Sequence, residues 1–244
     1  MNEDTRVAVC CYAGDQNQVV TMFDFYLHHD CPVVILSPED AKVEIEQRPD
    51  ALGRIDNRFG GEKCYIGEKA ITRMREHLKI LLTFPENFFL IHDADSFCLS
   101  TELPGYLYAE PDVVWSNLKF DDIPKQQAFY PKGFPHVSFQ PPWFLSRKTI
   151  KALLAVADDV TINPNMLFID YWLVQLAEKA GLPWKGFSDA ISYPTAEPFW
   201  AGAAWDAVRN RGTTFVHSVK SYEVCSKLVA AHKSFKKDQA HGRY

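Results

Sequence analysis

The sequence predicts an α/β domain in which buried strands alternate with helices, and two observations support this prediction. Short apolar runs bounded by polar residues are typical of strands buried on both faces of a sheet, and they span residues 7–12, 32–36 and 88–91. Between these runs, residues 16–29 and 67–84 carry apolar side chains at the spacing of a helix. The chain has 244 residues, of which 47% are hydrophobic, so one domain can bury a sizeable core.

Composition and charge disfavour several classes of function. Lys and Arg number 26 and Asp and Glu 31, and the resulting net charge of −5 gives no overall attraction for nucleic acid or anionic membranes. Residues 1–6 are polar and acidic, unlike a signal peptide, and no apolar segment is long enough to cross a membrane. The six cysteines contain no C-x-x-C pair, so a zinc site is not indicated. We therefore expect a cytoplasmic protein with no membrane partner.

The first predicted strand, residues 7–12, ends at a loop that begins Ala13-Gly14-Asp15. A glycine directly after a first parallel strand lets the backbone approach a ligand, and Tyr12 at the end of the strand is a candidate contact for a nucleotide. The loop has no G-x-G-x-x-G pattern, so a dinucleotide fold of the usual kind is not indicated.

The second predicted strand, residues 32–36, is closed by Ser37-Pro38-Glu39-Asp40. Asp40 can hydrogen-bond a ribose or a base at this position. The alternative, which we prefer on sequence grounds, is a helix N-cap with acidic residues in its first turn. Residues 47–61 are polar and rich in glycine, and they predict a loop with one short helix.

The helix predicted over residues 67–84 carries two basic side chains one turn apart near its start, Lys69 and Arg73. Both can reach a phosphate across the sheet. Basic residues on a helix more often form a solvated face, and the sequence leaves both interpretations open.

Two carboxylates one residue apart, Asp93 and Asp95, end the apolar run that begins at Phe88. Side chains alternate across a strand, so we expect both to project to the same side of the sheet. Neighbouring carboxylates repel, and both stay ionised only beside a positive charge, which a divalent cation with oxygen ligands supplies. Ligands of open α/β sheets bind outside the carboxyl ends of the strands, so this stretch predicts a metal site. The alternative is that both are turn residues that accept hydrogen bonds from backbone N–H groups.

The second half of the chain holds three further candidates. A helix predicted over residues 168–178 has Asp170 in its first turn, where a carboxylate can also simply stabilise the helix N-terminus. A β-like run over residues 213–220 contains His217 and ends at Lys220. A lone histidine is more often structural than a ligand, so this run is not decisive by itself.

The order of these motifs resembles that of GT-A glycosyltransferases, most closely the Fringe-like and β-galactosyltransferase type, from Arg6 to about Lys220. The resemblance rests on four motifs that follow one another along the chain. The first is Gly67-Glu68-Lys69-Ala70 followed by Ile91 to Phe97, and the second runs from Phe134 to Ser138 and on through Trp143 to Arg147. The third is Ile169 to Leu173 leading to Ala180-Gly181-Leu182, and the fourth is His217. The chain departs from the family pattern at three places. Ala94 stands inside the acidic triad, Gln140-Pro141-Pro142 replaces a glycine-rich segment, and the acidic pair is reduced to Ile169-Asp170.

The resemblance implies a GT-A, Rossmann-like fold with a mixed, mostly parallel sheet flanked by helices. It implies one catalytic domain over residues 1–244, with a donor-binding half at about 6–100, an acceptor-binding half at about 101–220, and a C-terminal helix and tail at 221–244. The implied activity is metal-dependent transfer of a sugar from a nucleotide-diphosphate sugar, UDP-sugar above all, to an acceptor hydroxyl. Asp93, Asp95 and His217 would hold Mn²⁺ or Mg²⁺.

The resemblance also assigns roles to the other candidates. Asp170 would be the general base of an inverting reaction, and the basic side chains Lys69, Arg73 and Lys220 would neutralise phosphate charge. Tyr12, Asp40 and Asp93 would contact the donor. The acceptor stays open between a glycan, a small molecule and a modified nucleobase in DNA.

Two other functions remain possible on sequence grounds. A sugar-phosphate nucleotidyltransferase can share the sheet and an acidic metal site, but it needs a glycine- and arginine-rich loop after the first strand. Residues 13–18 contain no basic residue, which disfavours it. A non-catalytic nucleotide-binding domain would bind the ligand without turnover.

Overall fold

The computed structural model describes residues 1–11, 16–28, 31–41, 43–44, 55–62, 67–98, 103–120, 137–160, 169–187 and 215–217, together with Glu223, Ser226, Lys227 and Ala230. The strands are β1 (Thr5–Cys10), β2 (Val33–Ser37), β3 (Ile55–Phe59), β4 (Phe88–Asp93), β5 (Ser96–Cys98), β6 (Val114–Phe120), β7 (Val137–Ser146), β8 (Trp184–Gly186) and β9 (Phe215–His217). The helices are α1 (Gln16–His28), α2 (Glu68–Leu81), α3 (Tyr106–Ala109), α5 (Arg147–Ala155) and α6 (Ile169–Lys179).

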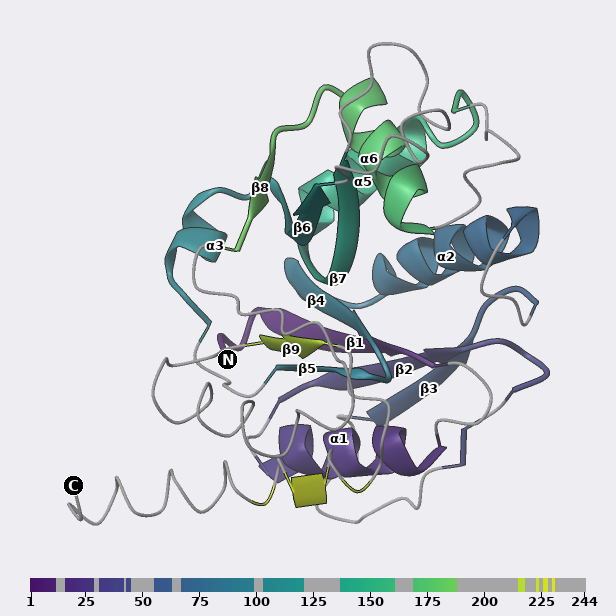
Figure 1. The fold of residues 1–244 in the computed structure, drawn as a ribbon, viewed down its shortest axis with the longest axis vertical. Helices are drawn as coiled ribbons and strands as arrows, with labels where there is room; N and C mark the ends of the chain where they lie inside the picture. The colour runs from purple at the N-terminus through teal and green to yellow at the C-terminus, as the bar shows by residue number, and fades with distance from the viewer. Residues whose placement is uncertain are drawn as a thin grey trace.

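Seven strands form one mixed sheet in the order β3-β2-β1-β4-β7-β6-β8, and β5 and β9 form a separate two-stranded sheet (Figure 1). Strands β1 to β4 run parallel to one another, β7 runs antiparallel to both β4 and β6, and β8 runs parallel to β6. This arrangement confirms the predicted fold class of a mixed, mostly parallel sheet flanked by helices. All four carboxyl ends of β1 to β4 therefore lie along one edge of the sheet.

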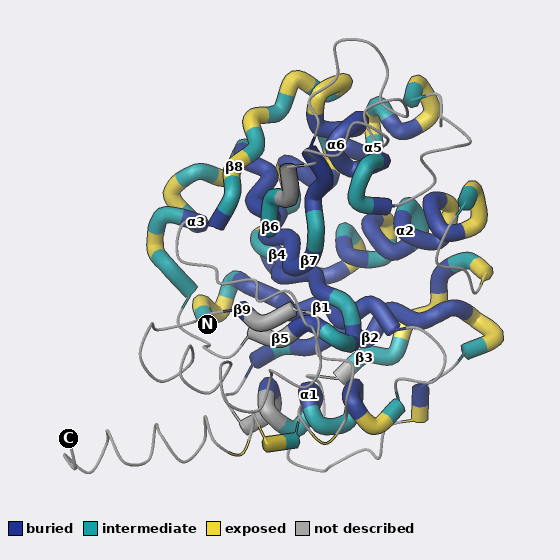
Figure 2. Tube along the Cα trace, in the orientation of Figure 1, coloured by how far each residue is buried: buried dark blue, intermediate teal, exposed yellow. Residues whose placement is uncertain are grey.

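The two faces of the sheet pack against different helices, and β1 shows how the sequence achieves this (Figures 1 and 2). Successive side chains of a strand point to opposite faces. Val7 and Val9 join the apolar cluster that contains α1, whereas Ala8 and Cys10 join the cluster that contains α2, α5 and α6. Because both faces are covered, the central strands are apolar throughout, which is what made them visible in the sequence.

Strands β3 and β7 were not indicated by an apolar run in the sequence. The loop predicted over residues 47–61 is wrong for residues 55–59, which form β3 at the edge of the sheet, where polar side chains meet solvent. Strand β7 contains Pro141 and Pro142, and a proline lacks the N–H that a sheet requires. The pairing of β7 with β6 shifts register here, from Gln140 opposite Asn117 to Trp143 opposite Ser116, and the pairing with β4 ends at Trp143. The two prolines thus lie at a bulge, where no ladder hydrogen bond is lost.

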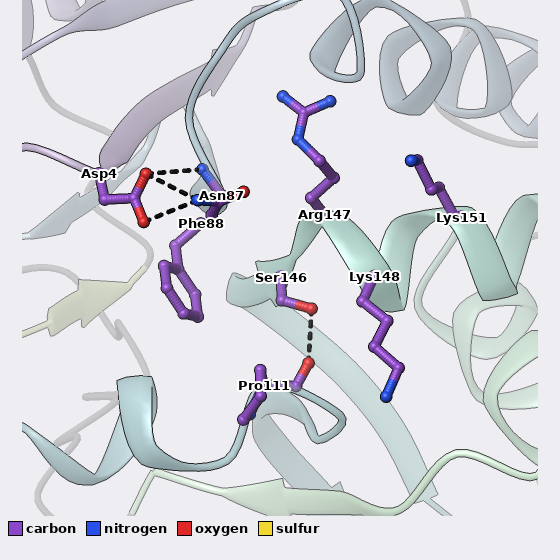
Figure 3. Close-up of a pocket in the computed structure, with 8 residues that line it drawn as sticks. All are labelled: Asp4, Asn87, Phe88, Pro111, Ser146, Arg147, Lys148 and Lys151. Atoms are coloured by element: carbon purple, nitrogen blue, oxygen red, sulfur yellow. Dashed lines mark hydrogen bonds between the residues drawn. The ribbon is translucent and has the colours of Figure 1, made fainter.

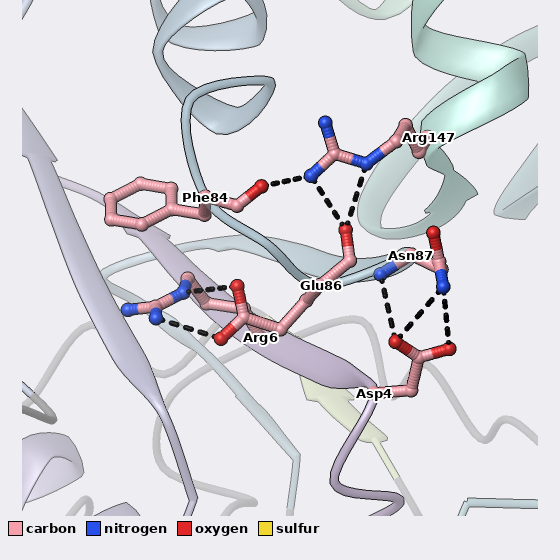
Figure 4. A network of polar contacts seen from close by, with 6 residues as sticks. All are labelled: Asp4, Arg6, Phe84, Glu86, Asn87 and Arg147. Carbon is pink, nitrogen blue, oxygen red and sulfur yellow. Dashed lines mark hydrogen bonds and ion pairs between the residues drawn. The ribbon is translucent and has the colours of Figure 1, made fainter.

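The opposite edge of the sheet, at the amino ends of β1 and β4, is held by a set of polar contacts that we call the amino-edge clamp: Asp4, Arg6, Glu86, Asn87 and Arg147 (Figure 4). The Arg6 guanidinium makes two hydrogen bonds of 2.7 and 3.0 Å to the buried Glu86 carboxylate. Arg147, the first residue of α5, donates to the carbonyls of Leu82, Phe84 and Glu86. The clamp therefore ties β1, the turn between α2 and β4, and α5 together.

Candidate functional site

The strand order reverses between β1 and β4, because β2 and β3 lie on one side of β1 and β4 lies on the other. Open α/β sheets bind ligands in the crevice outside the carboxyl ends of the strands at such a point. The last residues of the two strands, Cys10 and Asp93, are paired in register. The predicted metal ligand Asp93 thus lies where the topology favours a ligand.

Asp93 and the buried, positively charged side chain of Arg73 both act on the Cys10 thiol. It follows Phe89 and Ile91 on the face of the sheet that packs against α2, as does Cys10. Burial raises the pKa of the Cys10 thiol most, the negative charge of Asp93 raises it further, and the positive charge of Arg73 lowers it. Arg73 belongs to α2 and is fully buried. The Cys10 thiol, the Asp93 carboxylate and the Arg73 guanidinium therefore form one electrostatically coupled group beneath the edge of the sheet.

The position of Arg73 differs from the expectation for a phosphate ligand on the surface. Its guanidinium has no exposed surface in this conformation, so a phosphate outside the sheet cannot reach it. A charged residue at helical spacing gives no sign of such burial in the sequence, because most such residues are solvated.

Asp95 is positioned by a turn and not by a strand. Strand β4 ends at Asp93, and Ala94 and Asp95 form the turn that leads into β5. The alternation of side chains along a strand therefore does not decide where Asp95 points. Its orientation depends on how the peptide that follows Asp93 is held.

Strand β9 places the backbone of His217 next to this turn. In the antiparallel pair of β5 and β9, His217 lies opposite Ser96, the residue directly after Asp95. Residues directly opposite in an antiparallel pair have Cα atoms about 4.5–5.5 Å apart. The backbone of His217 is thus close to the segment Asp93-Ala94-Asp95, which we call the acidic turn, although 121 positions of sequence separate His217 from Ser96. The side chain of His217 lies outside the described part of the structure.

A buried histidine directly before Asp93 was not singled out in the sequence. His92 is 1% exposed, lies 2.8 Å from the Tyr26 hydroxyl through Nε2, and lies 2.8 Å from the carbonyl oxygen of Asp93 through Nδ1. Tyr26 belongs to α1 and is fully buried. The only sequence signal is a polar ring inside an apolar run, which does not reveal its partner.

A pocket of about 690 Å³ opens at the same edge of the sheet and is lined by Glu39, Asp40, Gly61, Glu62 and Lys69. It brings together two predicted donor contacts, Asp40 and Lys69, from the end of β2 and the start of α2. Lys69 forms an ion pair with Glu62, and both side chains are largely exposed. Asp40 lies in a turn closed by a hydrogen bond from Ala41 to Pro38, so the preferred interpretation of a helix N-cap is wrong for the described residues here.

The structure gives less information about the three remaining candidate site residues. Asp170 lies in the first turn of α6 and is half-buried. Tyr12 and Lys220 lie outside the described residues.

A second pocket, of about 440 Å³, lies at the amino edge and contains none of the predicted site residues (Figure 3). Ser146 lines it and caps α5, since its hydroxyl accepts a hydrogen bond from the Thr149 amide. Arg147 also lines it, but its guanidinium already donates to backbone carbonyls. This pocket is a structural junction at the opposite edge from Asp93.

The side chains at the acidic turn are suited to only part of the coordination shell of a hard divalent cation. Within the described residues, no group of three His, Cys, Asp or Glu side chains converges on one point. Asp93 and Asp95 supply carboxylate oxygens, and Mg²⁺ is commonly held by one or two carboxylates together with water and substrate phosphates. The residues present therefore fit a cation that shares its coordination with a phosphorylated substrate.

Comparison with known proteins gives only distant similarities. No protein family and no curated protein matches the sequence. The crystal structure of 4-diphosphocytidyl-2C-methyl-D-erythritol synthase aligns over 85% of this chain and 98% of its own, at 15% identity and a TM-score of 0.44. That of a protein from Desulfovibrio desulfuricans, described as a nucleotide-diphospho-sugar transferase, aligns over 96% and 98%, at 8% identity and a TM-score of 0.44. Neither similarity assigns the chain to a family, and neither supports the predicted Fringe-like or β-galactosyltransferase subtype.

Among the described residues, no helix is both long enough and apolar enough to pass through a bilayer.

Proposed function

We propose that this protein is a metal-dependent glycosyltransferase that moves a sugar from a nucleotide-diphosphate sugar, with UDP-sugar as the first candidate, to an acceptor hydroxyl. The observation that supports it is the place of Asp93, in register with Cys10 at the reversal of strand order, followed by Asp95 in the next turn. A nucleotide at this edge would meet both carboxylates.

In this proposal Asp93 and Asp95 hold Mn²⁺ or Mg²⁺, and His217 is the third protein ligand. The bound cation would stabilise the negative charge that develops on the leaving nucleoside diphosphate. Imidazole ligation favours Mn²⁺ as an alternative to Mg²⁺. Arg73 takes a different part from a phosphate ligand: its buried charge offsets that of Asp93 from inside the protein.

The pocket at the carboxyl ends of β2 and β3 is the proposed place of the nucleoside. The Asp40 carboxylate accepts a hydrogen bond from a ribose hydroxyl, and the Lys69 ammonium donates to a phosphate oxygen once it leaves Glu62. An exposed ion pair costs little to break, so this exchange is open to a ligand. Tyr12 and Lys220 remain proposed donor contacts.

Asp170 is the proposed general base if the reaction inverts the anomeric centre. Its carboxylate would accept the proton of the acceptor hydroxyl as the new glycosidic bond forms. The acceptor classes remain a glycan, a small molecule and a modified nucleobase in DNA, and a cytoplasmic location remains part of the proposal.

Nucleotidyl transfer is the alternative, because the same sheet edge and the same carboxylate pair would serve a nucleoside triphosphate. The two reactions release different products. Incubation with UDP-sugars and Mn²⁺ should release UDP, and excess chelator should stop this release. Release of pyrophosphate from a nucleoside triphosphate and a sugar phosphate, without hydrolysis of any nucleotide sugar, would replace the proposal with the alternative.

A further inference from the structure

A buried hydrogen-bonded pair, Tyr26 and His92, joins helix α1 to the start of the acidic turn. The Tyr26 hydroxyl and His92 Nε2 lie 2.8 Å apart, and His92 Nδ1 lies 2.8 Å from the carbonyl oxygen of Asp93. The two rings also lie with centroids 5.7 Å apart. Since Tyr26 is 0% and His92 1% exposed, water does not compete for these contacts.

The two contacts specify which ring nitrogen carries the proton. A carbonyl oxygen only accepts hydrogen bonds, so His92 Nδ1 must carry a proton and donate to Asp93. In the neutral ring Nε2 then has a free electron pair, which accepts the hydrogen bond of the Tyr26 hydroxyl. The Asp93 carbonyl therefore fixes the tautomer of His92, and the Tyr26 hydroxyl holds the ring by donating to Nε2.

The held carbonyl determines how the chain leaves β4. A peptide unit is planar, so fixing the carbonyl of Asp93 also fixes the direction of the amide of Ala94. Ala94 is fully buried in the α1 cluster, and Asp95 follows it in the turn. Asp95 lies between the ends of β4 and β5, so the direction of the peptide after Asp93 contributes to how Asp95 is oriented.

The pair of Tyr26 and His92 lies on the opposite face of the sheet from the Asp93 side chain. The Asp93 side chain shares its face with Cys10 and α2, whereas His92 and Tyr26 belong to the face covered by α1. The carboxylate and the carbonyl of Asp93 thus meet different neighbours: the carboxylate shares its face with Cys10, and the carbonyl accepts the hydrogen bond of His92.

We infer that Tyr26 and His92 are positioning residues that orient the Asp93-Ala94-Asp95 turn for a divalent cation. This inference rests on the proposed function, because it assigns the turn a cation to bind. Neither residue touches the substrate, and the effect passes through the backbone of Asp93. A displacement of about 1 Å at a catalytic group can reduce turnover by about a hundredfold, and outer-shell partners typically change metal affinity by about 10–100-fold.

Two amide substitutions of His92 separate its two hydrogen bonds. The side-chain nitrogen of Asn can occupy the place of Nδ1, so His92→Asn keeps a donor for the Asp93 carbonyl and loses the contact with Tyr26. The nitrogen of Gln reaches the place of Nε2, so His92→Gln keeps the Tyr26 contact and loses the donor for Asp93. Both replace an imidazole by an amide, so the pair is matched in polarity.

The experiment measures Mn²⁺ binding in the presence of UDP by titration calorimetry, and the Mn²⁺ activation constant for release of UDP from a UDP-sugar. We expect His92→Gln to weaken Mn²⁺ binding about tenfold or more, and His92→Asn to remain within about threefold of the natural protein. Equal Mn²⁺ binding by His92→Gln and the natural protein would overturn the inference and leave the proposed function standing. Absence of both Mn²⁺ and UDP binding in the natural protein would overturn the proposed function, and the inference with it.

A second pair of variants keeps the test valid if the His92 substitutions do not fold. Tyr26→Phe removes the hydroxyl that holds the His92 ring at Nε2, and Tyr108→Phe removes a hydroxyl that accepts a 3.2 Å hydrogen bond from Thr5 at the opposite end of β1. We expect weaker Mn²⁺ binding for Tyr26→Phe alone. Equal effects of the two variants on Mn²⁺ affinity would identify the Tyr26 contact as merely structural.

The tautomer itself can be observed without any ligand. Nitrogen NMR of ¹⁵N-histidine-labelled protein, with the His92 signals assigned by their loss in His92→Asn, should show a proton on Nδ1. A ring protonated on Nε2 alone would contradict the arrangement, whatever the activity of the protein.

Discussion

Cys10 and Asp93 are the terminal residues of adjacent parallel strands, and they pair in register at the point where the strand order reverses. The charge of Asp93 raises the pKa of the Cys10 thiol beyond the larger effect of burial, so the two side chains are also coupled electrostatically. A group at this position influences both the ligand crevice and the buried layer beneath it.

Replacement of this carboxylate tests the proposed site directly. Asp93→Asn removes the charge and keeps the shape, and we expect loss of metal-dependent release of UDP with the circular dichroism spectrum unchanged. The control is Asp158→Asn, which removes an exposed carboxylate that pairs with Arg75 at 2.6 Å, and it should retain full turnover. Full turnover in Asp93→Asn would be decisive against the metal site.

The buried ion pair of the amino-edge clamp should be a major contributor to stability. Glu86→Gln leaves the Arg6 guanidinium buried beside a neutral partner, and removal of one member of such a pair costs about 3–5 kcal/mol. Urea denaturation measures this loss. The exposed pair of Lys79 and Glu76 serves as the control, since Glu76→Gln should cost less than about 0.5 kcal/mol. Similar losses of unfolding free energy for both variants would show that the buried pair of the clamp contributes no more than an exposed ion pair.

His77 should make the stability of the protein depend on pH. Burial, and secondarily the charge of Arg73, lower the pKa of His77 from 6.5 to about 3, while the nearby Ser37 backbone opposes this shift. Between these two values the unfolded chain binds a proton that the folded chain does not, so stability falls as the pH falls. One such proton contributes a slope of about 1.4 kcal/mol per pH unit.

The comparison with His77→Gln isolates this contribution, because the other titrating groups are common to both proteins. Urea denaturation between pH 4 and pH 7 should give a steeper loss of stability in the natural protein than in His77→Gln. Parallel curves for the two proteins would show that the pKa of His77 is the same in the folded and unfolded states.

Three glycines allow backbone strain to be separated from steric overlap. Gly61 has φ of 70°, and an added Cβ would lie 2.8 Å from the Arg73 Cα atom. Gly181 has φ of 65° but open space around it, and Gly105 has φ of −60° and open space. We expect Gly181→Ala to cost about 1 kcal/mol from strain, Gly61→Ala to cost more, and Gly105→Ala to cost nothing. Equal losses for Gly61→Ala and Gly181→Ala in urea denaturation would show that the loop moves away from α2.

Burial explains which elements could be predicted from the sequence. Strands β1, β2 and β4 are covered on both faces, so each leaves an apolar run, and the helix predicted over residues 67–84 corresponds to α2 at Glu68–Leu81. Strand β3 leaves no such run because it lies at the edge, and the prolines of β7 conceal a strand that bulges around them.

The candidate site was only partly accessible to sequence reasoning. The end of an apolar run identified Asp93, because a strand that stops at a carboxylate places it at the edge of the sheet. The contact between Tyr26 and His92 joins residues 66 positions apart and depends on how α1 packs, which no local pattern encodes. Similarly, Gly61 lies close to the backbone of Arg73 in α2, and no local pattern in the sequence reveals this contact.

The amino-edge clamp lies at the opposite rim of the sheet from the acidic turn, so the contacts that secure the fold are separate from those that would recognise a substrate. Amino-acid replacements that accumulate around the ligand rim during divergence would leave the clamp intact. A protein built in this way can acquire a new ligand without first acquiring compensating stabilisation elsewhere.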